Sequence, residues 1–101
     1  EQLFGAGYSA CFGGAIGAAA GLAKIVLKPG NVKVTATVNL NQDESGYFLD
    51  VTLNAELQGI SQAQAEALVA KAHTICPYSK ATCGNIEVKL QANGQAVQVT
   101  A

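Results

Sequence analysis

The sequence predicts a single α+β domain, because segments with helical periodicity alternate with segments of strand-like periodicity. A long uncharged stretch rich in Ala opens the chain at residues 2–23, and a second helical pattern lies at residues 61–76. Two stretches of alternating apolar and polar residues lie between them, and a shorter pair follows. The predicted order is therefore α-β-β-α-β-β, with the long first helix packed on an antiparallel sheet, and residues 1–101 form one domain.

Composition limits both the core and the range of partners. Half of the 101 residues are hydrophobic, but most of these are Ala and Val, so close packing of small side chains matters more than bulky anchors. Six Lys and no Arg face seven acidic residues, which gives a net charge of -1. This balance lacks the clustered basic surface that phosphates require, so no nucleic-acid partner is expected.

The first helix is expected to run from Gln2 to about Val26, because this stretch contains no Pro and is rich in Ala. Glycine weakens a helix, but Gly13, Gly17 and Gly21 recur every fourth residue and line one face, where another backbone can approach closely. About 20 apolar residues can also span a bilayer. Because Ala and Gly contribute little to insertion and the later strands have the two faces of a soluble protein, no membrane partner is expected.

Two long strands are expected next. Lys28, Pro29 and Gly30 end the first helix and turn the chain. Apolar and polar residues then alternate over residues 32–40 and again over residues 47–57, with a polar connection between them. This pattern is typical of an antiparallel hairpin with one buried face.

A second helix is expected to begin at Ser61, because Ser61 and Gln64 have the spacing of a capping box and Ile60 precedes them as a hydrophobic staple. It is expected to end near Cys76, because the residue before Pro77 is disfavoured in the helical conformation. Its apolar face, which packs on the sheet or on the first helix, comprises Ala65, Leu68, Val69 and Ala72.

A final pair of short strands is expected, with its apolar positions at residues 86–90 and at Val97 and Val99. Asn93-Gly94 between them is a strong signal for a hairpin turn. No linker or internal repeat divides the chain into two parts.

The cysteines carry most of the chemical information. Their number is three, which is odd, and neither a secretory leader nor an even disulfide framework accompanies them, so a cytoplasmic location is expected. Cys11 lies in the middle of the first helix and Cys76 at the end of the second. A buried free cysteine is most often a small hydrophobe, so the spacing alone leaves Cys11 as either a core residue or a nucleophile.

His73, Cys76 and Cys83 are a possible set of metal ligands, because His and Cys are the preferred donors for zinc. Their spacing supplies only three ligands and matches no common structural zinc pattern. No metal or other cofactor is therefore expected. The simpler interpretation of Cys83 is a small residue on a turn before Gly84.

Two motifs flank the predicted hairpin and second helix, EQLFGAGYSACF at residues 1–12 and CPYSKATCGNI at residues 76–86. In sequence and in order they resemble the organic hydroperoxide resistance family, within the Ohr/OsmC superfamily of thiol peroxidases. The resemblance implies an Ohr/OsmC-like fold, an interlocked two-fold homodimer and a cytoplasmic enzyme. It also implies a thiol-dependent peroxidase that reduces alkyl and fatty-acid hydroperoxides to alcohols without a cofactor. A lipoyl-bound dithiol is the implied reductant that returns the oxidised enzyme to its thiol form.

The same resemblance assigns roles to individual residues. Cys11 is expected to be the peroxidatic thiolate, which becomes a sulfenic acid, and Cys76 the resolving thiol, which condenses with it to a disulfide. The negative end of the second helix should keep Cys76 the less acidic thiol. Glu1 aligns with an acidic residue that, in the family, pairs with an Arg beside the reactive sulfur.

The missing Arg leads to an expectation about the start of the chain. A carboxylate beside Cys11 disfavours a thiolate by like-charge repulsion, so a cation is needed. Glu1 also opens an apolar helix with no N-cap residue before it. We therefore expect residues upstream of Glu1 that carry the Arg and supply the first strands of the sheet.

Other residues near the two motifs have two interpretations each. Tyr8, Phe12 and Ile16 are expected to line an apolar channel for a lipid-like peroxide, with core packing as the alternative. Tyr78 and Ser79 position the loop that holds Cys76, or simply form a structural turn. For the whole chain, the alternatives to a peroxidase are a non-catalytic binding or structural member of the same fold and the metal site at the end of the second helix.

Overall fold

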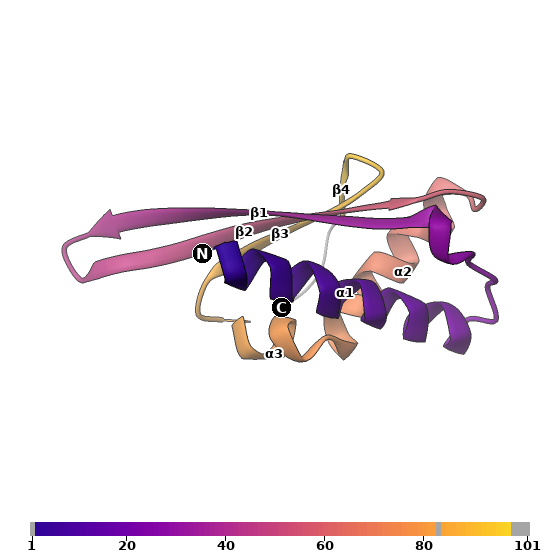
Figure 1. The fold of residues 1–101 in the computed structure, drawn as a ribbon, viewed down its shortest axis with the longest axis horizontal. Coiled ribbons are helices and arrows are strands. Elements are labelled where there is room, and N and C mark those ends of the chain that lie inside the picture. Colours follow the sequence, from indigo (N-terminus) through magenta and orange to yellow (C-terminus); the bar gives the residue numbers. More distant parts are fainter. Residues whose placement is uncertain (1, 83, 98–101) are drawn as a thin grey trace.

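The computed structural model describes residues 2–82 and 84–97, in which helices cover one face of a four-stranded sheet (Figure 1). The predicted order of elements is confirmed, with two short helices in addition. The elements are α1 (Gln2–Leu22), the 3₁₀ helix η1 (Pro29–Asn31), β1 (Val32–Asp43), β2 (Gly46–Leu57), α2 (Gln62–Ile75), α3 (Pro77–Thr82), β3 (Glu87–Ala92) and β4 (Gln95–Val97).

The sheet has the strand order β1-β2-β3-β4 and is mixed rather than antiparallel throughout. β1 with β2 and β3 with β4 are antiparallel hairpins, whereas β2 and β3 run parallel, with Val51 opposite Val88. Parallel neighbours need a crossover of a dozen or more residues, which α2 and α3 provide on the helical face of the sheet. The prediction of an antiparallel sheet was therefore wrong at this one pairing. Val99 lies outside the described residues.

The β1–β2 hairpin extends beyond the stretches in which apolar and polar residues alternate, residues 32–40 and 47–57. Its pairing extends to Asp43 opposite Gly46, through residues that were expected to form a polar connection. Asp50 explains part of this extension, because its carboxylate accepts hydrogen bonds from Asn39 and Asn41 on β1, both at 2.8 Å. At the tip, the Asp43 carboxylate accepts a hydrogen bond from the backbone N–H of Ser45. The hairpin end projects beyond the helices (Figure 1).

Helix α1 ends at Leu22, four residues earlier than Val26. The cause is a left-handed residue, since Lys24 has φ 58° and ends the helix in a Schellman arrangement. Lys24 N–H donates to the carbonyl of Gly21, and Ile25 N–H to that of Ala20. This position is usually Gly, so the sequence offers little signal for the stop.

The core lies between the sheet and the helices. Its largest fully buried side chains come from α1, β2 and α2, and those of α1 recur at a spacing of four, which places them on one helix face. They include Tyr8, Phe12, Ile16, Val51, Leu53 and Val69.

Among the described helices, only α1 has the length and composition of a membrane span, which core helices of soluble proteins share. Here its buried face forms part of this core.

The predicted glycine stripe is not where backbones meet. Gly17 and Gly21 are exposed, and no described atom lies within 4 Å of a Cβ built at either one. Close approaches occur instead near the start of the helix. A Cβ on Gly5 would lie 3.2 Å from Val38, and a Cβ on Gly7 would lie 2.7 Å from the hydroxyl of Tyr78.

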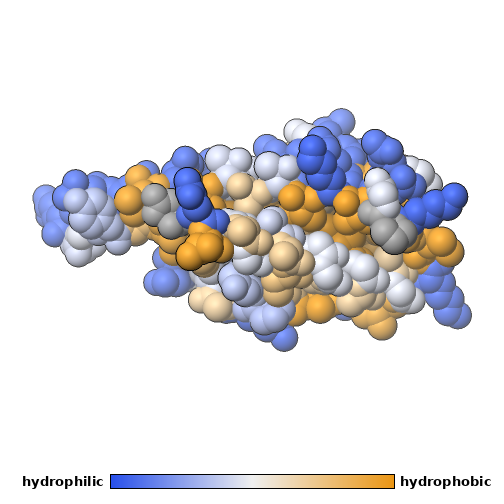
Figure 2. Space-filling model, viewed as in Figure 1, coloured by the Kyte–Doolittle hydropathy of each residue, from blue (hydrophilic) through white to orange (hydrophobic). Residues whose placement is uncertain are grey.

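Apolar side chains also reach the surface. In Figure 2 the projecting hairpin end is mainly hydrophilic, whereas apolar patches occur over the rest of the visible face. Leu3 and Leu22 on α1 and Val26 after it are exposed by 89%, 71% and 88%. Large exposed apolar residues are typical of surfaces that bind a partner when they are contiguous.

Candidate active site

Cys11 and Cys76 meet where α1 crosses the end of α2. Their Sγ atoms are 3.4 Å apart, and both are free thiols. Cys11 is half-buried, whereas Cys76 is fully buried. A disulfide bond is about 2.05 Å long, so the sulfurs need to approach by only roughly 1.3 Å to form one.

Local structure places Cys76 at the junction of two helices. Ser61 begins α2 with the predicted capping box, in which Ser61 and Gln64 exchange side-chain to backbone hydrogen bonds, each of 3.2 Å. Cys76 leaves the helical conformation with ψ 123°, as expected before Pro77. Its N–H still donates to Ala72 at 2.8 Å, and its carbonyl accepts from Lys80 of α3 at 3.1 Å. Cys76 is therefore a single extended residue between α2 and α3.

The pKa of Cys76 is raised above its ordinary value, mainly because burial disfavours the thiolate. Backbone N–H groups of Ser79 and Tyr78 lower this pKa, and the neighbouring Cys11 raises it. Burial, and not the end of α2, is therefore the main cause of the raised pKa of Cys76. Cys76 stays protonated near neutral pH, and its S–H donates to the sulfur of Cys11.

Three buried hydroxyl groups join α1 to α3 next to the sulfurs. The Oη atom of Tyr8 lies 2.8 Å from the Oγ of Ser79 and 3.4 Å from that of Thr82. The Thr82 hydroxyl in turn donates to the carbonyl oxygens of Tyr78 and Ser79, at 3.0 and 3.2 Å. Burial raises the pKa of Tyr8, so its phenol stays protonated. The sequence does not indicate this contact, because Tyr8 and Ser79 are 71 positions apart.

An aromatic cluster lies over the same crossing. Tyr78 of α3 packs against Phe4 and Tyr8 of α1, with ring centroids 6.2 and 5.7 Å apart, and Tyr8 also contacts Phe12. Tyr78 is 39% exposed, so it lies at the rim of the cluster. Tyr78 and Ser79 were expected to position a loop that holds Cys76, or to form a turn, but both belong to helix α3.

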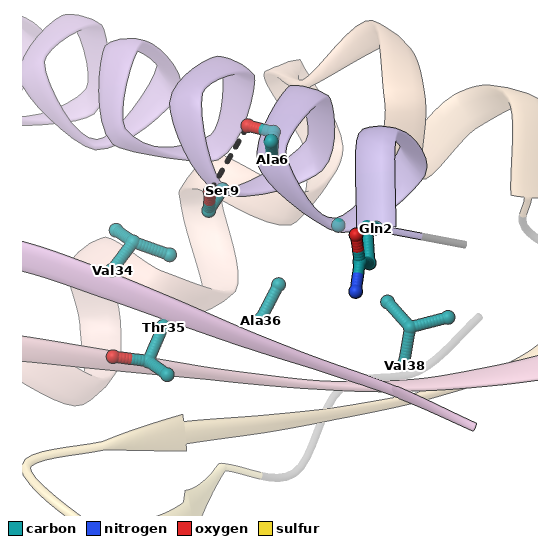
Figure 3. A pocket seen from close by; sticks show the side chains of 8 residues that line it. Gln2, Ala6, Ser9, Val34, Thr35, Ala36 and Val38 are labelled. Atoms are coloured by element: carbon teal, nitrogen blue, oxygen red, sulfur yellow. Dashed lines mark hydrogen bonds between the residues drawn. The ribbon is translucent and has the colours of Figure 1, made fainter.

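The residues expected to line a channel are in the core. Tyr8, Phe12 and Ile16 each have 0% exposure, which agrees with the core-packing alternative. A shallow cavity of about 470 Å³ lies elsewhere, between the start of α1 and β1 (Figure 3). Ser9 points toward it and donates to the carbonyl of Ala6 at 3.0 Å. The lining residues, which do not include Cys11, are Gln2, Gly5, Ala6, Ser9, Val34, Thr35, Ala36 and Val38.

The alternative metal site can be assessed only in part, because Cys83 lies outside the described residues. Within residues 2–82 and 84–97, no group of three His, Cys, Asp or Glu side chains is placed to hold a metal ion. Burial lowers the pKa of His73, which keeps it neutral, and its Nδ1 is buried with no hydrogen-bond partner among the described atoms. Glu1 also lies outside the described residues.

Comparison with known proteins decides the family. The model of the OsmC-like protein family matches residues 1–91. This chain belongs to the OsmC-like family. Organic hydroperoxide resistance protein OhrA of Bacillus subtilis is 50% identical to it over 93 residues, which cover 90% of this chain and 64% of that relative.

Solved structures of OsmC-like relatives share the fold. The organic hydroperoxide resistance protein OsmC of Legionella pneumophila has a TM-score of 0.85 and 50% identity, with 91% of this chain and 66% of that chain covered. OhrB of Bacillus subtilis has a TM-score of 0.85 and 44% identity, with 91% and 67% covered. The chain therefore spans about two thirds of the length of these relatives.

Proposed function

We propose that this OsmC-like chain is the thiol-bearing part of a peroxidase that reduces organic hydroperoxides to alcohols. The observation that carries the proposal is the 3.4 Å separation of the Cys11 and Cys76 sulfurs. The similar proteins named for organic hydroperoxide resistance support the same substrate class. The role of the chain is then protection of the cell against oxidative stress.

In the first step, the Cys11 thiolate attacks the terminal oxygen of the hydroperoxide. The O–O bond breaks and an S–O bond forms, so that Cys11 becomes a sulfenic acid. The alkoxide leaves and takes up a proton to become the alcohol. Cys11 suits this role better than Cys76 because its side chain is half-buried rather than fully buried, so a substrate can reach its sulfur.

In the second step, Cys76 attacks the sulfur of the Cys11 sulfenic acid. An S–S bond forms and the S–O bond breaks, and the hydroxyl group leaves as water with the proton of the Cys76 thiol. A dithiol reductant, which we propose to be lipoyl-bound, then converts the disulfide back to two thiols and becomes a disulfide itself. Two electrons from the dithiol thus reduce the peroxide to alcohol and water.

The apolar surroundings of Cys11 favour an alkyl or fatty-acid peroxide. Tyr8, Phe12 and Ile16 form a continuous buried face beside it, with 0% exposure each. Because they are buried, these three side chains can exclude water from one side of the Cys11 sulfur. Their direct contact with the alkyl chain of the substrate stays a prediction.

The reactive thiolate needs a positive charge nearby, and the chain contains no Arg. We propose that an Arg from outside these 101 residues pairs with Glu1 and with the Cys11 thiolate. Arg suits this position because its planar guanidinium can bind two anions and keeps its charge. Peroxidase activity of the 101-residue chain by itself would contradict this part of the proposal.

A homodimer in the cytoplasm is part of the same proposal. Leu3 and Leu22 at the two ends of α1 are largely exposed, and a second copy of the chain would cover such apolar side chains.

The experiment that tests the function is intact mass measurement on the full-length protein before and after one equivalent of an alkyl hydroperoxide. We expect a loss of two hydrogens, mapped by peptide analysis to a disulfide between Cys11 and Cys76. Unchanged thiols would contradict the peroxidase and favour a non-catalytic binding protein. Stoichiometric zinc in the untreated protein would favour the metal site at His73, Cys76 and Cys83 instead.

A further inference from the structure

Two neighbouring residues of α1 contact two neighbouring residues of α3, directly beside the sulfurs. Gly7 lies under the hydroxyl end of Tyr78, and Tyr8 is hydrogen-bonded to Ser79. We call these four residues the α1–α3 seam. Neither contact includes a reacting atom, and the two proposed steps give no role to the hydroxyl group of Tyr8 or to Gly7, Tyr78 and Ser79.

The Gly7 contact depends on the absence of a side chain. A Cβ built on Gly7 would lie 2.7 Å from the Oη of Tyr78 and 3.1 and 3.2 Å from two carbons of its ring. Any larger residue at this position must push the ring of Tyr78 away from α1. Gly17, in the same helix, is exposed and has no described atom within 4 Å of its built Cβ.

The Tyr8 contact is a hydrogen bond shielded from water. Tyr8 and Ser79 are 0% and 1% exposed, and their oxygens are 2.8 Å apart. A buried hydroxyl that loses its partner is costly, so this bond holds α3 at one position along α1.

The seam connects these contacts to the cysteines through the backbone. Cys11 follows Gly7 by four residues, about one helical turn, and therefore lies on the same side of α1. Cys76 precedes α3 directly and is its junction with α2. A shift of α3 along α1 would therefore move the Cys76 sulfur relative to that of Cys11, while the surroundings of Cys11 on α1 would stay in place.

We propose that the α1–α3 seam positions Cys76 for attack on oxidised Cys11. It sets the rate of disulfide formation and leaves the preceding reaction of Cys11 with the peroxide unchanged. Gly7, Tyr8, Tyr78 and Ser79 are positioning residues in this scheme, which rests on the proposed peroxidase function. Only the second of the two steps depends on how α3 lies on α1.

The test compares Ser79→Ala, Gly7→Ala and the matched control Gly17→Ala in the full-length protein. Each is mixed with one equivalent of cumene hydroperoxide, quenched at intervals with a sulfenic-acid trap and a thiol-blocking reagent, and measured by intact mass. We expect oxidation of Cys11 within about twofold of the wild-type rate in all variants. Disulfide formation should slow on the order of tenfold in Ser79→Ala and Gly7→Ala, and not in Gly17→Ala.

The outcomes separate this inference from the proposed function. If the wild-type protein forms no Cys11–Cys76 disulfide, the proposed peroxidase function is contradicted. A wild-type protein that forms it, with both seam variants forming it equally fast, overturns the positioning role. The positioning role is also overturned if a seam variant slows Cys11 oxidation and disulfide formation equally, because this indicates a general structural defect. Slower disulfide formation in Gly17→Ala would overturn it as well. Thermal unfolding of each variant checks that it folds, and Tyr78→Ala replaces any seam variant that does not.

Discussion

The Sγ atom of Cys76 lies 3.4 Å from that of Cys11, although the two residues are 65 positions apart in the chain. The local sequence around each cysteine does not account for this proximity. Their approach depends on how α2 and α3 pack against α1, where a shift of one helical turn, about 5.4 Å, would prevent bond formation.

Replacing the peroxidatic thiol should remove activity completely. We expect Cys11→Ser to reduce consumption of an alkyl hydroperoxide to the rate in buffer, because a serine hydroxyl is far less nucleophilic than a thiolate. The measurement is loss of peroxide with a dithiol reductant present. Residual activity above background would show that another thiol reacts with the peroxide.

Replacing the resolving thiol should have a different effect. We expect Cys76→Ser to complete one turnover and then stall, because the Cys11 sulfenic acid has no neighbouring thiol with which to condense. Intact mass should show one added oxygen on Cys11. Equal steady-state activity of Cys11→Ser and Cys76→Ser would contradict the assigned roles.

The buried thiol of Cys76 should make the reduced protein less stable at alkaline pH. Because burial raises the pKa of Cys76, the folded state holds the thiol proton more tightly than the unfolded state does. This stabilisation is complete below the unfolded-state pKa of about 8.5 and is lost as the pH rises through the folded-state pKa. Urea unfolding under reducing conditions should show this decline, and Cys76→Ala should flatten it.

His73 should make the protein less stable at acidic pH. Burial lowers the pKa of His73, so below the unfolded-state value of about 6.5 the unfolded chain binds the proton more readily than the folded chain. The stability that the neutral side chain contributes is therefore present above this pH and lost as the pH falls through the folded-state pKa. His73→Gln should reduce the slope of unfolding free energy below about pH 6.5, and an unchanged slope would contradict the assignment.

The capping box of α2 gives a prediction that is independent of catalysis. Ser61→Ala should lower the free energy of unfolding by about 1 kcal/mol, because the N–H of Gln64 loses its acceptor. Ser61→Asp retains an acceptor at this position and should stay close to the wild type. Thermal or urea unfolding of both variants provides the measurement, and an equal loss in both would argue against the cap.

The sequence by itself determined the two longer helices, the four strands and their order, but not the two short helices. The alternation of residues 32–40 and 47–57 and the capping box at Ser61 depend on residues close together in the chain, and all were found in the structure. The motifs around Cys11 and Cys76 likewise placed the chain in its family, which the match over residues 1–91 confirmed. Local signals of this kind need no knowledge of tertiary packing.

Only the tertiary structure decided how these elements meet. The parallel pairing of β2 with β3, the approach of Cys76 to Cys11 and the hydrogen bond of Tyr8 to Ser79 all join segments that are distant in sequence. The physical reason is that such contacts depend on the relative positions of packed helices and strands, and a neighbouring residue carries no information about an atom that arrives from the other end of the chain.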